Sequence, residues 1–227
     1  MFTKATKTNV APKIAFQGVS GAGKTYSALR FARGYTDGKI ALIDTENGSA
    51  SIYADAFEFD VCNISPRTFG ASRQFWWTDF RDAIDAAKDY DFVILDSASH
   101  LWQGVLDYKT RLDDGGGNSF TNWNKAGQQY STVINMILQS PIPFICCFRS
   151  KTEYALQQGD GGKVVPVKLG LAPIARDGID YEFTLALDIN RDHSYTVSKS
   201  RIPLPESRII DEDLGRQVRN YFNGEVK

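Results

Sequence analysis

Short apolar segments alternate with longer segments of helical periodicity along most of the chain. Five of these segments are rich in β-branched or aromatic residues, as buried strands are, and lie at Ile14–Phe16, Ile40–Ile43, Phe59–Ile64, Phe92–Leu95 and Ile142–Phe148. Strands that alternate with helices are typical of a mainly parallel sheet with helices packed on it. The pattern therefore predicts an α/β fold with a mainly parallel central sheet.

Helical periodicity is strongest between Ser119 and Gln139. Apolar residues recur there at spacings of three, four and seven, at Phe120, Trp123, Tyr130, Ile134, Ile137 and Leu138. Asn118 or Ser119 supplies an N-cap, and Pro141 follows the predicted end. A weaker amphipathic pattern predicts a helix over about residues 73–88, and a last helix is expected over about residues 211–222.

The sequence pattern changes after Phe148, where short strand-like segments are separated by turns. These segments are Tyr154–Gln157, Val164–Leu169, Tyr181–Ile189 and Tyr195–Ser198, and a Gly-Asp-Gly-Gly turn occupies Gly159–Gly162. This pattern predicts a C-terminal antiparallel extension of the same sheet. No linker-like composition or internal repeat interrupts the chain, so we expect a single domain over residues 1–227, with residues 1–11 as a flexible tail.

Composition narrows the class of protein. The chain has 227 residues, 42% of them apolar and 23% charged, which is ordinary globular composition. A net charge of -1 means that any contact with nucleic acid must rest on a local basic patch. Three cysteines, two of them adjacent, argue against a disulfide framework, and no apolar run is long enough for a membrane span or a signal peptide. We therefore expect a protein of the reducing cytoplasm with no membrane partner.

A phosphate-binding motif provides the most specific chemical signal. Gly18-Val-Ser-Gly-Ala-Gly-Lys24-Thr25 matches GxxxxGK(S/T) and lies between a predicted strand and a predicted helix. Glycines let backbone amides face phosphates at the N-terminus of a helix, Lys24 would reach the β and γ phosphates, and Thr25 would hold Mg²⁺. The alternatives are a glycine-rich turn without a ligand and a dinucleotide fingerprint, but the glycine spacing differs from GxGxxG. We expect a nucleoside triphosphate to bind at Gly18, Ser20, Gly21, Ala22, Gly23, Lys24, Thr25 and Tyr26, and the resemblance described below implies that it is ATP.

Carboxylates follow two of the predicted strands. Asp96 ends the apolar segment that begins at Phe92 and fits a Walker B acid, which holds Mg²⁺ or its water. Asp44 and Glu46 end another strand, and Glu46 could accept a proton from the attacking water. Acids at strand ends also cap loops, and Asn47-Gly48 is a turn signal, so turn roles stay open for Asp44, Glu46 and Asp96.

Taken in order, the segments GVSGAGKT, ALIDTE, DFVILDS, FICCFRSK and VSKSRIP resemble RecA-like P-loop ATPases. They are most similar to small phage-encoded nucleotide-binding proteins related to RecA that act in single-strand annealing, over about Ile14–Pro205. The resemblance implies a RecA-like core, with Glu46 as catalytic base and Asp96 as the Walker B acid. It also implies that Lys199 and Arg201 reach the γ phosphate of a neighbouring subunit, in a homo-oligomer with nucleotide at the interface.

The sequence departs from the RecA pattern in two respects. Cys146 and Cys147 occupy the region where such proteins carry a polar residue that senses the γ phosphate, so Arg149 or Ser150 is the available substitute. The accessory N- and C-terminal domains of RecA have no counterpart in this chain. Filament formation therefore does not follow from the resemblance.

The DNA-facing loops of such proteins correspond here to residues 113–118 and to the hairpin at residues 151–168. The first loop is acidic. From Arg149 to Arg176 the second has five basic residues against two acidic ones, namely Arg149, Lys151, Lys163, Lys168 and Arg176 against Glu153 and Asp160, and Tyr154 could stack on a base. A solvated hairpin with ordinary surface lysines is the alternative interpretation.

Three functions are compatible with these features. The first is a Mg²⁺-dependent ATPase that binds single-stranded DNA and assists phage recombination or strand annealing in the host cytoplasm. The second is a nucleotide-gated binding module with negligible turnover, and the third is a small-molecule phosphotransferase, for which an arginine-rich lid is missing. His100 is expected to be a packed or capping residue and His193 to lie exposed in a turn.

Overall fold

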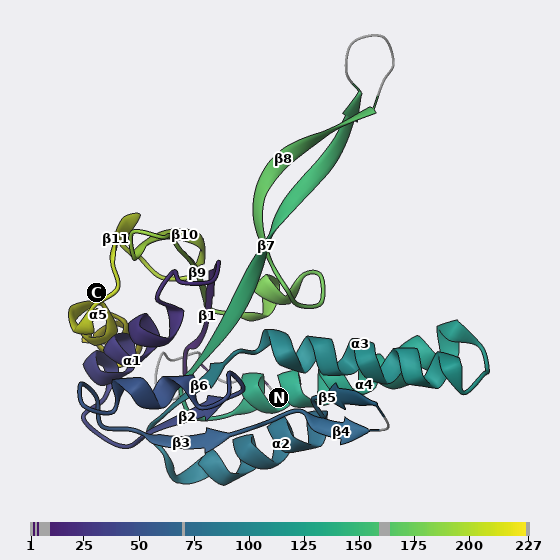
Figure 1. Cartoon of the computed structure of the whole chain (residues 1–227). Coiled ribbons are helices and arrows are strands. Elements are labelled where there is room, and N and C mark those ends of the chain that lie inside the picture. The colour runs from purple at the N-terminus through teal and green to yellow at the C-terminus, as the bar shows by residue number, and fades with distance from the viewer. Residues whose placement is uncertain (1, 3, 5–9, 70, 159–163, 226–227) are drawn as a thin grey trace.

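The computed structural model describes residues 2, 4, 10–69, 71–158 and 164–225, and for residues 69, 152–158, 164–170 and 207 it describes the backbone alone. Most of the tail predicted at residues 1–11 and the turn predicted at residues 159–162 lie outside the described residues. Figure 1 shows a twisted central sheet, helices on both of its faces, and a two-stranded arm that extends away from it.

The central sheet has nine strands in the order β11-β10-β9-β1-β7-β6-β2-β3, with β8 paired to β7. The parallel strands are β1 (Lys13–Gly18), β2 (Ile40–Asp44), β3 (Asp60–Asn63), β6 (Phe92–Asp96), β7 (Phe144–Gln158) and β9 (Leu185–Ile189). The antiparallel strands are β8 (Val164–Pro173), β10 (Ser194–Ser200) and β11 (Ser207–Ile209). The predicted α/β fold, with its mainly parallel sheet and C-terminal antiparallel extension, is thus confirmed.

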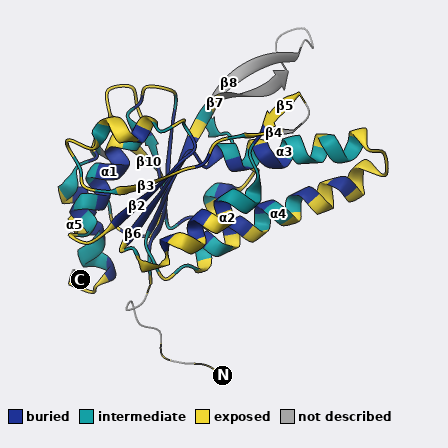
Figure 2. Ribbon diagram, turned by 60° about the horizontal axis from the view of Figure 1, so that its bottom comes forward, coloured by how far each residue is buried: buried dark blue, intermediate teal, exposed yellow. Residues whose placement is uncertain are grey.

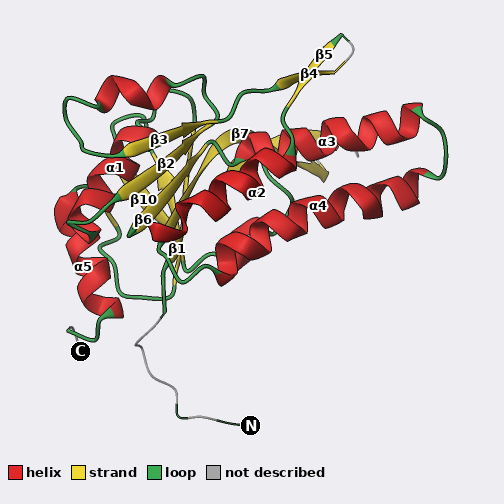
Figure 3. Ribbon diagram, turned by 90° about the horizontal axis from the view of Figure 1, so that it is seen from below, coloured by secondary structure: helices red, strands yellow, loops and turns green. Residues whose placement is uncertain are grey.

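Helices cover both faces of the sheet and form two apolar cores (Figures 2 and 3). On one face lie α1 (Lys24–Tyr35) and α5 (Glu212–Phe222), and on the other lie α2 (Trp77–Ala86), α3 (Ser99–Asp114) and α4 (Ser119–Gln139). Alternate residues of β1 divide between the cores, because Ile14 and Phe16 join the first and Ala15 the second. Among the described residues, none of the helices is both long and apolar enough to cross a bilayer.

Local chemistry sets several helix boundaries. The Asn118 side chain accepts hydrogen bonds from the amides of Phe120 at 2.8 Å and Thr121 at 3.3 Å. Of the two residues predicted to cap α4, Asn118 is therefore the cap and Ser119 is not. Asp211 caps α5 through the Leu214 amide at 2.9 Å. Gly215 permits close packing of α5 on α1, because a Cβ there would lie 2.1 Å from the Phe31 carbonyl oxygen.

Two predicted elements differ from those observed. The strand expected over Tyr181–Ile189 begins only at Leu185, because the 3₁₀ helix η4 (Ile179–Glu182) replaces its first part. The helix expected over residues 73–88 begins at Trp77 and ends in the 3₁₀ helix η2 (Ala87–Asp89). A small hairpin of β4 (Arg67–Phe69) and β5 (Ser72–Gln74) precedes α2, and the 3₁₀ helix η1 (Ser49–Tyr53) follows β2.

The strand order gathers the candidate residues at one edge of the sheet. In the register of the parallel strands, Asp44 lies opposite Asp96, Asp96 opposite Cys147, and Gly18 opposite Arg149. The carboxyl ends of β1, β2, β6 and β7 therefore meet where α/β sheets bind ligands.

Candidate nucleotide-binding site

The turn between β1 and α1 has the backbone that a phosphate loop requires. Gly21 and Gly23 adopt left-handed φ angles of 78° and 84°, and Gly23 is the N-cap of α1. The first-turn amides of α1 face the end of this turn, where the helix dipole favours an anion. The loop therefore has the backbone geometry that phosphate binding requires.

Lys24 reaches back over the loop that precedes it. Its Nζ donates hydrogen bonds to the carbonyl oxygens of Gly18 and Val19, each at 3.0 Å, and the residue is 9% exposed. These bonds hold the ammonium group over the loop and use two of its three hydrogens. The positive charge of Lys24 therefore lies at the loop, where phosphates of a bound nucleotide would lie.

Thr25 and Asp96 meet across the sequence. The Thr25 hydroxyl donates to Oδ2 of Asp96 at 2.5 Å, and Asp96 is 4% exposed. Burial raises the pKa of Asp96 to about 6, while the Thr25 hydrogen bond and the nearby Lys24 oppose the rise. The pair offers two hard oxygen ligands at one point, which suits Mg²⁺ with its remaining ligands from phosphate and water.

Asp44 and Glu46 have different roles in this structure. The buried Asp44 carboxylate accepts hydrogen bonds from the amides of Glu46 at 2.5 Å and Ala50 at 2.9 Å. These bonds order the loop after β2, which makes Asp44 a turn residue, as one interpretation of the sequence allowed. Glu46 instead lines the cavity next to the phosphate loop.

Arg149 forms an ion pair with Glu46. Its Nε and Nη2 donate to Oε1 of Glu46 at 3.0 and 2.9 Å, and both side chains are partly exposed. Within the described residues, Oε2 of Glu46 accepts no hydrogen bond. The charge of Arg149, which the sequence assigned to a DNA-facing hairpin, thus lies at this site, where β7 leaves the sheet.

These groups line one cavity of about 480 Å³, a size typical of small-molecule sites. The lining residues are Ser20, Gly21, Gly23, Lys24, Thr25, Glu46, Tyr53, Asp96, Arg149, Ser150 and Ile174, and we call this space the nucleotide cavity. Three other predicted binding residues do not line this cavity. Gly18 is the last residue of β1, Ala22 is buried, and the ring of Tyr26 packs on that of Tyr53 with the ring centroids 5.4 Å apart.

Two residues of the nucleotide cavity add to the predicted set. Tyr53, in η1, presents a partly exposed aromatic ring that could stack on a base. Its only sequence signal is its place as an aromatic residue in the short segment after Glu46. The buried Ser150 hydroxyl has no hydrogen-bond partner among the described residues, so a polar atom is available for a ligand oxygen.

Lys199 and Arg201 lie away from the phosphate loop of their own chain. The Lys199 ammonium donates to the carbonyl oxygens of Asp180 at 2.8 Å and Tyr181 at 2.6 Å, and Arg201 reaches the Tyr181 carbonyl at 3.4 Å. Both therefore contact the 3₁₀ helix η4 in this chain. Their predicted action on a neighbouring nucleotide stays a prediction.

Each of the two histidines contacts a loop of the candidate site. His100, at the start of α3, stacks on Phe75 at 4.6 Å, and its Nδ1 lies 2.7 Å from the Thr45 hydroxyl, as expected for a packed residue. Burial and Arg149 lower its pKa. His193 is exposed in the β9–β10 turn, but its Nδ1 lies 3.1 Å from the Ala22 carbonyl oxygen, a contact with the phosphate loop that the sequence did not indicate.

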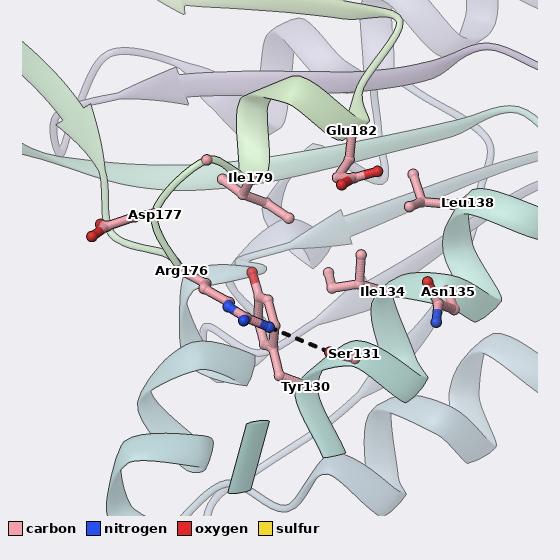
Figure 4. A pocket seen from close by; sticks show the side chains of 10 residues that line it. Tyr130, Ser131, Ile134, Asn135, Leu138, Arg176, Asp177, Ile179 and Glu182 are labelled. Carbon is pink, nitrogen blue, oxygen red and sulfur yellow. Dashed lines mark hydrogen bonds between the residues drawn. The ribbon is translucent and has the colours of Figure 1, made fainter. Parts of the chain in front are cut away.

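A separate cavity of about 330 Å³ lies between α4 and η4 (Figure 4). Arg176 lies beside Tyr130 and donates to the Ser131 hydroxyl at 3.4 Å, while Glu182 lies on the opposite side of the cavity. Tyr130 and Ile134 form its floor. Arg176, like Arg149, therefore lies at the base of the β7–β8 hairpin and has a partner within the chain.

The comparisons with known proteins agree with this geometry. The model of the family described as "AAA domain" matches residues 11–210. The chain belongs to this AAA domain family. Its phosphate loop, Asp96 and Glu46 all lie within the matched part, so the AAA domain match and the site geometry both indicate a P-loop ATPase domain that binds a nucleotide.

Other comparisons add little to the AAA domain match. No curated protein matches the chain significantly. Among the 48 matching chains of solved structures is a prototypical ATPase from the type III secretion system of pathogenic bacteria, at 12% sequence identity and a TM-score of 0.45. That match covers 80% of this chain and 51% of the other, so this chain spans about half the length of that ATPase.

Proposed function

We propose that this chain is a Mg²⁺-dependent ATPase of RecA-like fold that binds single-stranded DNA and assists phage recombination or strand annealing. The observation that supports the ATPase part is the convergence of Lys24, the Thr25–Asp96 pair and Glu46 on one cavity. Phosphate binding, metal binding and a proton acceptor are the three parts that phosphoryl transfer to water requires.

The residues of the cavity have separate roles in this proposal. Lys24 and the loop amides bind the β and γ phosphates of ATP, and Thr25 and Asp96 hold Mg²⁺, which when bound neutralises phosphate charge. Oε2 of Glu46 accepts a proton from water as the water oxygen bonds to the γ phosphorus. The bond from that phosphorus to the bridging oxygen breaks, and ADP leaves with the electron pair. Arg149 holds the glutamate through Oε1.

A change at Arg149 tests whether the ion pair contributes to turnover. We expect Arg149→Ala to slow ATP hydrolysis by up to about 10²-fold, because Glu46 then loses the contact that orients it and a positioned general base contributes about 10²-fold or more. Arg149→Lys should restore only part of the rate, because an ammonium group cannot repeat the two-nitrogen contact with Glu46. Steady-state ATP turnover measures both. Arg81→Ala, which removes an exposed arginine on α2 that does not line this cavity, is the control. Wild-type rates in all of these variants would contradict the role of Arg149.

The proposed action of Lys199 and Arg201 in a neighbouring subunit leads to a mixing experiment. We expect the Lys199→Ala/Arg201→Ala double variant and Lys24→Ala to be inactive alone and to recover some turnover when mixed. A mixed interface can pair an intact phosphate loop with intact basic residues. Since both residues also bond to η4, thermal unfolding must show that the double variant is folded. Co-assembly without turnover would assign Lys199 and Arg201 a role within their own chain.

Support for the DNA-binding part comes from the β7–β8 arm and from the RecA resemblance. The arm, formed by residues 150–158 of β7 with β8, projects away from the sheet (Figure 1), and Lys151 at its base is exposed. The side chains of Tyr154 and Lys168, and all of Lys163, lie outside the described residues, so their predicted contacts with DNA stay predictions. Strand β7 passes directly from the nucleotide cavity into the β7–β8 arm, so it could couple nucleotide binding to DNA binding.

One observation favours a nucleotide-gated module with negligible turnover as a second candidate. Two nitrogen atoms of Arg149 donate to Oε1 of Glu46, so one of the two carboxylate oxygens is engaged in an ion pair and is not free to accept a proton from water. ATP turnover measured with and without single-stranded DNA separates the two candidates. Stimulation by DNA supports the ATPase, whereas tight ATP binding without turnover in either condition supports the gated module.

A further inference from the structure

A third cavity lies at the base of the β7–β8 arm. It has a volume of about 350 Å³ and is lined by residues that include Gln17, Lys151, Leu171, Pro173, Asp188 and Ser198; we call it the arm-base cavity. Among the described residues it shares no lining residue with the nucleotide cavity. The two are nevertheless adjacent in the chain, because Ser150 lines one and Lys151 the other.

Gln17 is the unusual residue of the arm-base cavity. It is 5% exposed, yet its side-chain amide forms no hydrogen bond with the residues that the structure describes. Its amide nitrogen and oxygen stay accessible, so one donor group and one acceptor are open to a ligand in the arm-base cavity. In the sheet register Gln17 lies opposite Asp188, which places both side chains on the same face.

Asp188 adds a hydrogen-bond acceptor beside that amide. Burial raises the pKa of Asp188, and the neighbouring Ser198 hydroxyl partly offsets this rise. Asp177 and Asp180 also line the arm-base cavity, so its three carboxylates outnumber the two cations, Lys151 and Arg176, and do not favour a phosphate group inside it. Leu171, which is 41% exposed, and Pro173 provide an apolar wall.

This combination matches the chemistry of a nucleobase. A base has flat apolar faces and an edge of donors and acceptors, and an amide with a carboxylate can pair with an edge that bears an amino group. We propose that the arm-base cavity binds one base of single-stranded DNA by its amino-bearing edge, next to Gln17 and Asp188, with Lys151 near the adjoining phosphate. This inference rests on the proposed DNA-binding function.

The proposal implies discrimination between two bases of equal size. Cytosine presents an amino donor where thymine presents a carbonyl oxygen, and that oxygen would face the Asp188 carboxylate without a hydrogen to share. Matched contacts of this kind are worth about 1–3 kcal/mol, so oligo-dC should bind about 5- to 150-fold more tightly than oligo-dT of the same length.

Fluorescence anisotropy with labelled oligo-dC and oligo-dT, at fixed salt with Mg²⁺ and ATP, tests this inference. We expect Asp188→Asn, which replaces the acceptor by an amide of the same shape, to bring the ratio of the two affinities to about one or to invert it. Lys151→Ala should weaken both complexes and leave the ratio unchanged. Asp82→Asn, at an exposed position on α2, is the control and should change neither.

The outcomes separate this inference from the function on which it rests. Equal binding of the two oligonucleotides by the wild-type chain, or an unchanged ratio in Asp188→Asn, would overturn the base site while DNA binding stands. Failure of the wild-type chain to bind either oligonucleotide would overturn the DNA-binding function and the base site together. Unaltered ATP binding by Asp188→Asn shows that the variant is folded.

Discussion

Glu46→Gln is expected to bind ATP with nearly wild-type affinity and to hydrolyse it at least about 10²-fold more slowly, the usual scale for loss of a positioned general base. Glutamine keeps the length and shape of the side chain, and its carbonyl oxygen can still accept from Arg149. It cannot take the proton of the attacking water. Binding of a fluorescent ATP analogue and single-turnover hydrolysis measure the two steps separately.

The structure gives this prediction a matched control. Glu58→Gln removes the same charge from an exposed residue outside the nucleotide cavity and should leave hydrolysis unchanged. Full turnover by Glu46→Gln would show that Glu46, like Asp44, serves the turn after β2. A loss of ATP affinity equal to the loss of rate would show that Glu46 acts in binding and not in proton transfer.

Features that depend on neighbouring residues could be predicted from the sequence. The phosphate loop, the strand that ends at Asp96 and the cap of α4 at Asn118 each follow from a few adjacent residues. The Glu46–Arg149 ion pair could not be predicted, because it joins residues 103 positions apart. It forms only because β7 lies between β1 and β6 in the sheet, and strand order is not a local property.

The error at η4 has a physical reason as well. Tyr181, Phe183 and Leu185 alternate with polar residues as a strand does, and Phe183 and Leu185 are indeed buried. Gly178, at a left-handed φ of 78°, precedes a 3₁₀ helix that buries Ile179 and Phe183 and leaves Tyr181 exposed. Lys199 donates to the carbonyl oxygens of Asp180 and Tyr181 in this helix. A tertiary contact thus decides between two structures that the local pattern fits.

Lys24→Ala is expected to lower ATP affinity by about 10²- to 10⁴-fold, since charge-assisted hydrogen bonds are worth about 1.5–3 kcal/mol each and the ammonium group would contact both the β and γ phosphates. The fold should remain, because the lysine contacts only the carbonyl oxygens of Gly18 and Val19 among the described hydrogen-bond acceptors. Equilibrium binding of ATP with Mg²⁺ and thermal unfolding measure the two quantities.

The shape of the side chain and its charge can be separated at this position. Lys24→Met keeps most of the aliphatic stem that is packed in the loop and removes the ammonium group, so it should lose as much affinity as Lys24→Ala. Lys125→Ala, on α4 and outside the nucleotide cavity, should bind ATP as the wild-type chain does. If Lys24→Met kept wild-type affinity, the charge would not bind phosphate, and the loop between β1 and α1 would have to be a turn that only joins strand to helix.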